Sequence, residues 1–372
     1  MNHKQWNFSQ LDTWFFRESR PYDSIGGSQL ATVFPPSART IAGAVRTLIG
    51  EQAEINWDAF NKGDGAAHNL SKINLHEEIG DADNLGKLRL IGPYLLYKGQ
   101  RLYSVPLFLL EKEGQFIRLR PGDPVECDLG YVRLPELEKT IAGAKPIENA
   151  WLTGDDLEQV LAGKNPSSYY LSTDLFEIEP RLGIAINRER RTVEEGMLYQ
   201  NQHVRLRDDN LQIGVMVGGI NEVLHPEKRA RVRFGGEGRL AEVTITSSNL
   251  PKLALPKNLN KNIVLTLLSP ANLEGSWLPK GFTELSSESK EKIWRGTLNG
   301  VELTIISAVL GKSIREGGWN LANKQPREVI SLIPAGSVWF CQVENGNAAD
   351  LHGYQIGQET ELGRGELAVG VW

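Results

Sequence analysis

Short runs of apolar or alternating residues dominate the hydrophobic pattern along the chain. Residues 263–268, 301–306 and 337–343 are examples, and glycines and prolines separate such runs throughout the sequence. Runs of this length between turn-forming residues are typical of β-strands. Because strands predominate and do not alternate regularly with helices, we expect an α+β fold with largely antiparallel sheets rather than a doubly wound parallel sheet.

One helix is predicted after the two prolines at positions 35 and 36. Ser37 is a suitable N-cap, and Gly50 follows the last apolar position, so we expect the helix to end there. At about 100° per residue, Arg39, Gly43 and Arg46 share one face of this helix, which therefore combines two cations with uncovered backbone. The apolar residues on the other face are Ile41, Val45, Leu48 and Ile49.

A glycine-containing segment occurs twice. Residues 236–245 and 363–372 have Gly, Gly, Leu and Ala at the same offsets, and each segment continues into a β-rich stretch. We interpret them as two glycine loops that each lead into the last strand of a duplicated unit, with chance similarity as the alternative. The units would cover residues 1–250 and 262–372. Residues 51–172 are too long for a connection and would form an insertion in the first unit.

Composition and charge limit the class of protein. The chain has 372 residues, of which 40% are hydrophobic and 23% charged, as expected for a folded protein of two or three domains. The net charge of -5 means that any nucleic-acid site is a local patch. Cys127 and Cys341 are far apart, which argues against a disulfide scaffold or a cysteine-based zinc site and favours a reducing, cytoplasmic location. We expect no leader peptide and no membrane span.

Motifs for cofactors and catalysis are incomplete. The two glycine loops match G-x-G-x-x-A, but no predicted helix follows either of them to bind a dinucleotide. Residues 311–313 lack the first glycine of a P-loop, and His76-Glu77 lacks the second histidine of a zinc protease. We therefore expect no cofactor, no metal site and no catalytic residue. If the protein is an enzyme, His203 is the candidate acid or base.

The residue types that single-stranded RNA binding requires occur close together. Residues 181–207 and 225–239 each carry a local charge of +3. Arginines supply contacts to phosphates, glycines permit close approach of the backbone, and aromatic rings stack on bases. Phe15 and Phe16 precede Arg17, and a charged segment around residues 188–191 is compatible with a protruding hairpin. Core packing or a solvated loop is the alternative for each segment, but their joint occurrence favours RNA.

The chain resembles a known family: the third subunit of the Cmr effector complex, a RAMP-superfamily protein of type III-B CRISPR systems. The resemblance rests on motifs that span nearly the whole chain in order. These motifs are residues 15–21, 36–46, 183–187, 194–199, 234–241, 317–319, 333–338 and 362–365.

The resemblance implies two ferredoxin-like (RRM-like) modules and a non-catalytic role. Such a subunit binds the 5′ handle of the CRISPR RNA and joins the large polymerase-like subunit to the backbone subunits, with target RNA nearby. The family's RNA-contacting hairpin would correspond to residues 187–199. Together, the residue pattern and the resemblance give these candidate RNA-binding residues: Arg17, Arg39, Gly43, Arg46, Arg188, Arg190, Arg191, Gly235, Gly236, Gly238, Arg239, Gly363, Arg364 and Gly365.

Two other functions remain open from the sequence. Some RAMP relatives are guide-processing endoribonucleases, in which case His203 would be the acid or base. Alternatively, the chain is a purely structural adaptor whose basic patches bind acidic protein surfaces. Within the expected insertion, Tyr94, Tyr97, Tyr103 and Phe108 are candidates for protein contact, and ordinary core packing explains them equally well.

Overall fold

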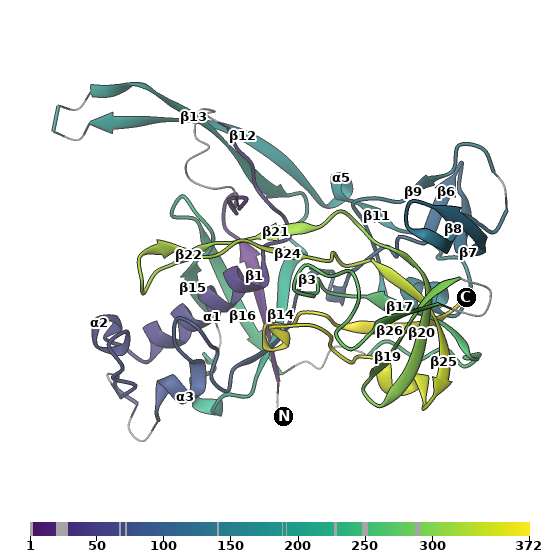
Figure 1. Ribbon diagram of the computed structural model, residues 1–372. Coiled ribbons are helices and arrows are strands. Elements are labelled where there is room, and N and C mark those ends of the chain that lie inside the picture. The colour runs from purple at the N-terminus through teal and green to yellow at the C-terminus, as the bar shows by residue number, and fades with distance from the viewer. Residues whose placement is uncertain are drawn as a thin grey trace. The chain divides into compact units, whose positions relative to one another are not determined.

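The chain forms two compact units in the computed structural model (Figure 1). Unit 1 comprises Met1–Gly99, Thr173–Asn249 and Arg315–Val329, and unit 2 comprises Gln100–Ser172, Leu250–Ile314 and Ile330–Trp372. The expected strand-rich α+β class with largely antiparallel sheets is confirmed. The structure describes residues 3–19, 29–66, 68–70, 73–139, 141–187, 189–190, 192–226, 229–247, 252–286 and 291–372.

The main sheet of unit 1 is antiparallel and has a densely aromatic core. Five of its strands lie in the order β15, β16, β1, β14 and β3. Trp6 and Phe8 are two positions apart on β1, so both side chains point to the same face, where both are fully buried. Phe234 stacks on Phe8 with a ring-centroid distance of 4.9 Å. The strands are β1 (Lys4–Gln10), β3 (Arg89–Tyr97), β14 (Leu211–Gly218), β15 (Arg229–Arg233) and β16 (Leu240–Thr246).

Helix α1 (Ala38–Gln52) begins where the sequence predicts, with the side chain of Ser37 accepting a hydrogen bond from the Thr40 amide at 3.2 Å. Its apolar face is buried and packs against β3 and β15. The predicted end is wrong, because the helix continues through Gly50. A Cβ at Gly50 would lie 2.4 Å from the ring of Trp57, so this glycine permits close packing rather than ending the helix.

A long hairpin in unit 1 is formed by β12 (Phe176–Asn187) and β13 (Thr192–Leu206), which Figure 1 shows as an extended two-stranded ribbon. The expected hairpin at residues 187–199 is therefore present and longer than predicted. Strand β2 (Gln29–Leu30) pairs with β13 in parallel. The other described helical segments that lie wholly or partly in unit 1 are α2 (Trp57–Phe60), α3 (Leu75–Ile79), α5 (Ser172–Leu175) and the 3₁₀ turn η2 (Glu222–Leu224).

Unit 2 is built on a second antiparallel sheet, with strands in the order β18, β19, β20, β25, β17 and β26. Ile263, Leu265, Trp339 and Val369 belong to its buried core. The strands are β17 (Asn262–Leu267), β18 (Thr283–Ser286), β19 (Lys292–Leu298), β20 (Val301–Val309), β25 (Val338–Asn345) and β26 (Leu367–Val371).

Tyr94, Tyr103 and Phe108, for which the sequence allowed either protein contact or core packing, are all buried.

Smaller elements complete the described chain. The elements are β4 (Gln100–Arg101), β5 (Tyr103–Ser104), β6 (Leu109–Lys112), β7 (Gln115–Cys127), β8 (Gly130–Leu137), β9 (Lys145–Pro146), β10 (Ala150–Leu152), α4 (Gly154–Leu161), β11 (Tyr170–Leu171), β21 (Ile314–Glu316), β22 (Trp319–Asn320), β23 (Gln325–Pro326), β24 (Ile330–Leu332), η3 (Ala348–Leu351) and η4 (Thr360–Leu362).

Four strands in each main sheet have the same spatial order. In unit 1 the order is β16, β1, β14, β3, and in unit 2 it is β26, β17, β25, β20. When the four strands of each sheet are numbered by their order in the sequence, both sheets therefore have the spatial order 4-1-3-2. The two glycine loops immediately precede β16 and β26, so the repeat in the sequence corresponds to the same position in the two sheets.

Candidate nucleic-acid interface

Helix α1 carries the predicted face of Arg39, Gly43 and Arg46, but its two arginines are directed onto neighbouring segments. Arg39 Nε lies 3.6 Å from a carboxylate oxygen of the buried Glu316. Arg46 donates a hydrogen bond to the carbonyl oxygen of Gly80 at 3.1 Å, and burial lowers the pKa of Arg46 to about 10. Gly43 is exposed, and a Cβ there would meet no atom within 4 Å among the described residues outside its own helix.

Residues 315–329, far away in the sequence, lie against this face within unit 1. The Gly317 amide donates to Ser19 Oγ at 2.6 Å, and Arg327 donates to the carbonyl oxygen of Ala82 at 2.7 Å. The charge of Arg327 is close enough to Arg46 to contribute to its lowered pKa. Together with the Arg39–Glu316 pair, these contacts place the two ends of the short β22–β23 hairpin near the arginines of α1. Its side chains Trp319 and Leu321 are 48% and 80% exposed.

The first glycine loop packs on the segment that carries Arg17. The Gly236 amide donates to the carbonyl oxygen of Phe15 at 2.8 Å. Phe15 and Phe16 are buried, so the core interpretation of these rings is correct and they offer no exposed face to a base. Arg17 is partly exposed and forms an isolated β-bridge with Thr32. The structure therefore brings Arg17, the first glycine loop and α1 into one unit.

Arg239, at the end of this loop, contacts the turn after β1. Its Nη1 donates to Asp12 at 2.5 Å, and Arg181 and Arg205 approach the same carboxylate from the hairpin at 3.6 and 3.7 Å. The pKa of Asp12 is lowered by a hydrogen bond from the Thr13 amide and by these three arginines. Arg181 and Arg205 belong to the basic stretch 181–207 but are not among the candidate residues predicted from the sequence. No local signal identifies them, because the hairpin pairing brings them together.

His203 lies beneath this group of charges. It is 1% exposed, its Nδ1 lies 2.9 Å from Thr13 Oγ1, and its ring stacks on Phe15. Burial lowers the pKa of His203 to about 4, and the charges of Arg239 and Arg181 act in the same direction. His203 is therefore neutral and enclosed at physiological pH, which does not favour a role as an acid or base toward RNA.

The other candidate residues are less informative or lie elsewhere. Arg188 and Arg191 lie outside the described residues, and Arg190 is exposed at the end of the hairpin. Gly363 and Gly365 belong to unit 2 and have φ values of 84° and 72°. Arg364 is 2% exposed, with its Nε 3.4 Å from Glu359, so its guanidinium is directed into unit 2 rather than toward solvent.

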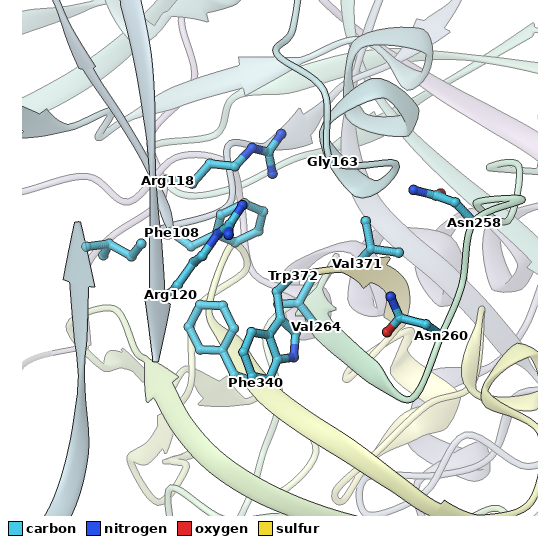
Figure 2. Close-up of a pocket in the computed structure, with 11 residues that line it drawn as sticks. Phe108, Arg118, Arg120, Gly163, Asn258, Asn260, Val264, Phe340, Val371 and Trp372 are labelled. Atoms are coloured by element: carbon cyan, nitrogen blue, oxygen red, sulfur yellow. The ribbon is translucent and has the colours of Figure 1, made fainter. Parts of the chain in front are cut away.

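A separate pocket in unit 2 has a volume of about 200 Å³ and is lined by aromatic rings that include Phe340 and Trp372 (Figure 2). Its arginines already have partners: Arg118 donates to carbonyl oxygens at the end of α4 and just beyond it, and Arg120 pairs with Glu138 at 2.9 Å. This pocket contains none of the candidate RNA-binding residues.

Across the described ranges, we find no group of three or more His, Cys, Asp or Glu residues that is arranged to hold a metal ion. No helix in those ranges is long and apolar enough to cross a membrane.

Comparison with known proteins identifies a family. The model of a family described as "CRISPR-associated protein (Cas_Cmr3)" matches residues 6–372. A chain in a solved structure of a type III-B Cmr-beta complex bound to cognate target RNA is 16% identical, with a TM-score of 0.47. A chain from such a complex with cognate target RNA and AMPPnP is 15% identical, with a TM-score of 0.45. Each match covers 90% of this chain and 86% of the other. No curated protein matches the chain.

Proposed function

Because this chain belongs to the Cas_Cmr3 family of CRISPR-associated proteins, we propose that it is a non-catalytic, RNA-binding subunit of a type III-B CRISPR effector complex. The family resemblance inferred from the sequence is thereby confirmed. In the proposed role, the subunit binds the 5′ handle of the CRISPR RNA and joins the large subunit to the backbone subunits, with target RNA nearby. It acts in the cytoplasm, where its two free cysteines remain reduced.

The proposed architecture consists of two ferredoxin-like modules, in residues 1–250 and 262–372. The shared strand order of the two main sheets supports this proposal, since the ferredoxin-like pattern places its four strands in the same way. In unit 1, α1 connects the first and second of these strands. A 3₁₀ turn, η2, lies where the pattern has its second helix. Residues 100–172, from the expected insertion, are grouped with unit 2.

The proposed RNA path follows the exposed face of α1 and continues to Arg17 and the first glycine loop. The observation that carries it is the exposed backbone at Gly43, which lies one helical turn from Arg39, the residue that faces Glu316. The distance of 3.6 Å between Arg39 and Glu316 is longer than the 2.7–2.9 Å of a charge-assisted hydrogen bond. Arg39 is proposed to exchange this contact for a phosphate, whereas Arg46 is proposed to position the turn at Gly80.

The experiment is to reconstitute the effector complex with Arg39→Glu and to measure CRISPR RNA occupancy during a salt titration. We expect weaker RNA retention and a shallower dependence on salt, because one phosphate contact is lost. Arg229→Glu is the matched control. Arg229 is an exposed arginine on β15, the edge strand of the main sheet of unit 1, and it also pairs with a glutamate, Glu242. Equal RNA occupancy in the wild type and Arg39→Glu at every salt concentration contradicts the proposed path.

The endoribonuclease alternative is tested separately. We propose a structural role for His203, because the ring is buried and its pKa is lowered to about 4. The purified protein is incubated with repeat RNA in the presence of a chelator, and no specific cleavage is expected. Cleavage that disappears in His203→Ala, in a variant that remains folded, overturns the non-catalytic proposal. Crosslinking of the assembled complex that recovers no RNA on this chain favours the structural adaptor instead.

A further inference from the structure

Three arginines from separate elements of unit 1 converge on one carboxylate. Arg181 lies on β12, Arg205 on β13 and Arg239 at the end of the first glycine loop, and all three approach Asp12. Only Arg239 is at hydrogen-bond distance, 2.5 Å, while the Nη2 atoms of the other two are 3.6 and 3.7 Å away. We call Asp12, Glu179, Arg181, Arg205 and Arg239 the Asp12 cluster.

Glu179 orients two of these arginines. One carboxylate oxygen accepts from Arg181 Nε at 2.7 Å, and the other accepts from Arg205 Nε at 2.6 Å. The hydrogen bonds and charges of both arginines lower the pKa of Glu179, so it remains ionised at neutral pH. Since Glu179 uses the Nε atoms, the Nη2 atoms of both arginines remain directed toward Asp12.

The cluster is supported from below and accessible from solvent. Gln10, just before the turn, bonds to the backbone of Val204 and Leu206, which fixes the base of the hairpin next to Asp12. Beneath the charges lies neutral His203, so the base of the cluster adds no charge near pH 7. The side chain of Asp12 is 50% exposed. Three arginines and two carboxylates leave one net positive charge on the group.

We propose that Asp12 occupies the position of an RNA backbone phosphate and that the phosphate displaces it when RNA binds. The inference rests on the proposed RNA-binding function. It adds Asp12, as an internal counter-ion, and Arg181 and Arg205 to the proposed RNA site. A phosphodiester carries the same single charge as a carboxylate, so it replaces the anion that faces the three arginines by one of equal charge, while Asp12 turns toward solvent. Its two non-bridging oxygens are spaced more widely, which suits three guanidinium groups better than the carboxylate that reaches only Arg239.

The exchange lowers the affinity of the cluster for phosphate. An internal carboxylate competes with every polyanion, so a single phosphate contact gains little at this cluster. RNA that also contacts α1 is held long enough to displace Asp12. This arrangement agrees with a protein whose net charge is -5 although its proposed RNA site is locally basic.

The test uses the full chain with a fluorescein-labelled single-stranded RNA of the repeat-derived handle sequence, and a scrambled RNA of equal length. In Asp12→Asn we expect the affinity for both RNAs to rise about threefold to tenfold, as expected from removing one exposed competing charge. The slope of log K against log salt should become steeper by up to about 0.7, the value for one phosphate contact on a single strand. The ratio of the two affinities should stay the same, because the carboxylate competes equally with both RNAs. In Arg181→Gln and Arg205→Gln the affinity should drop.

Glu222→Gln is the matched control, because it makes the same charge change in unit 1 and also breaks an ion pair, with Lys4. It should leave both the affinity and the slope unchanged. Asp12→Ser provides a second variant of the same site, and thermal unfolding verifies that each variant is folded. Addition of inorganic phosphate should weaken RNA binding to Asp12→Asn more than to the wild type, because the vacated position then accepts the free ion.

The outcomes separate this inference from the proposed function. Unchanged or weaker RNA binding in both folded Asp12 variants overturns the inference. If Gly43→Glu abolishes RNA retention in the same series, the proposed function stands without it. If neither Asp12→Asn nor Gly43→Glu changes RNA binding, the proposed function fails as well. If Asp12→Asn causes another subunit to dissociate from the complex while RNA binding is unchanged, the cluster is assigned to a protein contact. This result also overturns the inference.

Discussion

Gly235 lies directly over the backbone carbonyl of Phe15, so close that a Cβ on the glycine would be 2.4 Å from the carbonyl oxygen. The φ of Gly235 is 83°, in the left-handed region that favours glycine. The next amide, of Gly236, hydrogen-bonds to the same oxygen. The first glycine loop is therefore fixed to the segment that leads to Arg17, which joins two parts of the proposed RNA path.

This packing predicts unequal effects of two alanine substitutions in the loop. Gly235→Ala combines a backbone clash with an unfavourable φ, so we expect a loss of about 2–3 kcal/mol in the free energy of unfolding. Gly238 also has a positive φ, 65°, but a Cβ there would meet no atom within 4 Å among the described residues. Gly238→Ala should therefore cost only about 1 kcal/mol. Urea denaturation of both variants measures the difference, and equal losses contradict the packing argument.

Gly43 predicts opposite effects on stability and RNA binding. It lies inside α1, where replacing glycine by alanine gains about 0.5–1 kcal/mol and the open space accepts the methyl group. We expect Gly43→Ala to be more stable than the wild type and Gly43→Glu to remain folded. The added carboxylate of Gly43→Glu should repel a phosphate at the uncovered backbone, so the reconstituted complex should lose CRISPR RNA. Gly43→Gln, similar in size but neutral, separates charge repulsion from steric blocking.

Burial of two histidines predicts a loss of stability in acid. His203 and His225 are both buried, and desolvation is the largest cause of the lowering of each pKa to about 4. In the unfolded chain a histidine titrates near 6.5, so between about pH 6.5 and 4 the unfolded state binds more protons than the folded state. The free energy of unfolding should therefore fall by up to about 1.4 kcal/mol per pH unit for each histidine as the pH decreases through this window.

The measurement is urea denaturation at pH 7, 6 and 5 for the wild type and His203→Gln. The glutamine can still hydrogen-bond to Thr13 but does not titrate, so the variant should lose less stability between pH 7 and 5. Asp12 and Glu179 have lowered pKa values and contribute only at lower pH. Identical pH profiles in the two proteins contradict the role assigned to the buried imidazole.

Local chemistry explains what the sequence predicted correctly. Ser37 and the apolar spacing of residues 41–49 define the start and the buried face of α1, because capping and periodicity act within a few residues. The repeated glycine segment indicated equivalent strands, since both loops need glycine where the backbone makes close contacts. Gly365 illustrates this in unit 2: a Cβ there would lie 1.9 Å from the carbonyl oxygen of Ile356.

Tertiary contacts explain what the sequence did not predict. The end of α1 was misplaced because the reason for Gly50 is the ring of Trp57, which no pattern inside the helix reveals. Nothing in the sequence indicates that Gly317 bonds to Ser19, 298 positions away. The burial of Arg364 against Glu359 likewise depends on how the loop folds back. An arginine between two glycines predicts an exposed cation. The sequence does not show that the carboxylate of Glu359 lies against the guanidinium of Arg364.

Trp319 and Leu321 allow the role of residues 315–329 to be tested without disturbing the fold. Asn320, between them, is buried, and its side chain accepts hydrogen bonds from the amides of Ala322 and Asn323 at 3.1 and 3.2 Å, which fixes the turn. The two apolar side chains on either side are exposed although the backbone is well anchored. A half-exposed indole on this anchored turn is suited to stack on a base of single-stranded RNA.

We therefore expect Trp319→Ala to lose about 1–2 kcal/mol of stability, since about half of the side chain is buried, and to remain folded, while RNA retention in the complex falls several-fold. Trp319→Phe should retain most of the RNA, because an aromatic face is preserved. Leu321→Ala is the control: it removes a more exposed apolar side chain that has no ring to stack. RNA loss in Leu321→Ala equal to that in Trp319→Ala contradicts stacking. It would indicate instead that the hairpin contacts a protein surface, where both apolar side chains contribute.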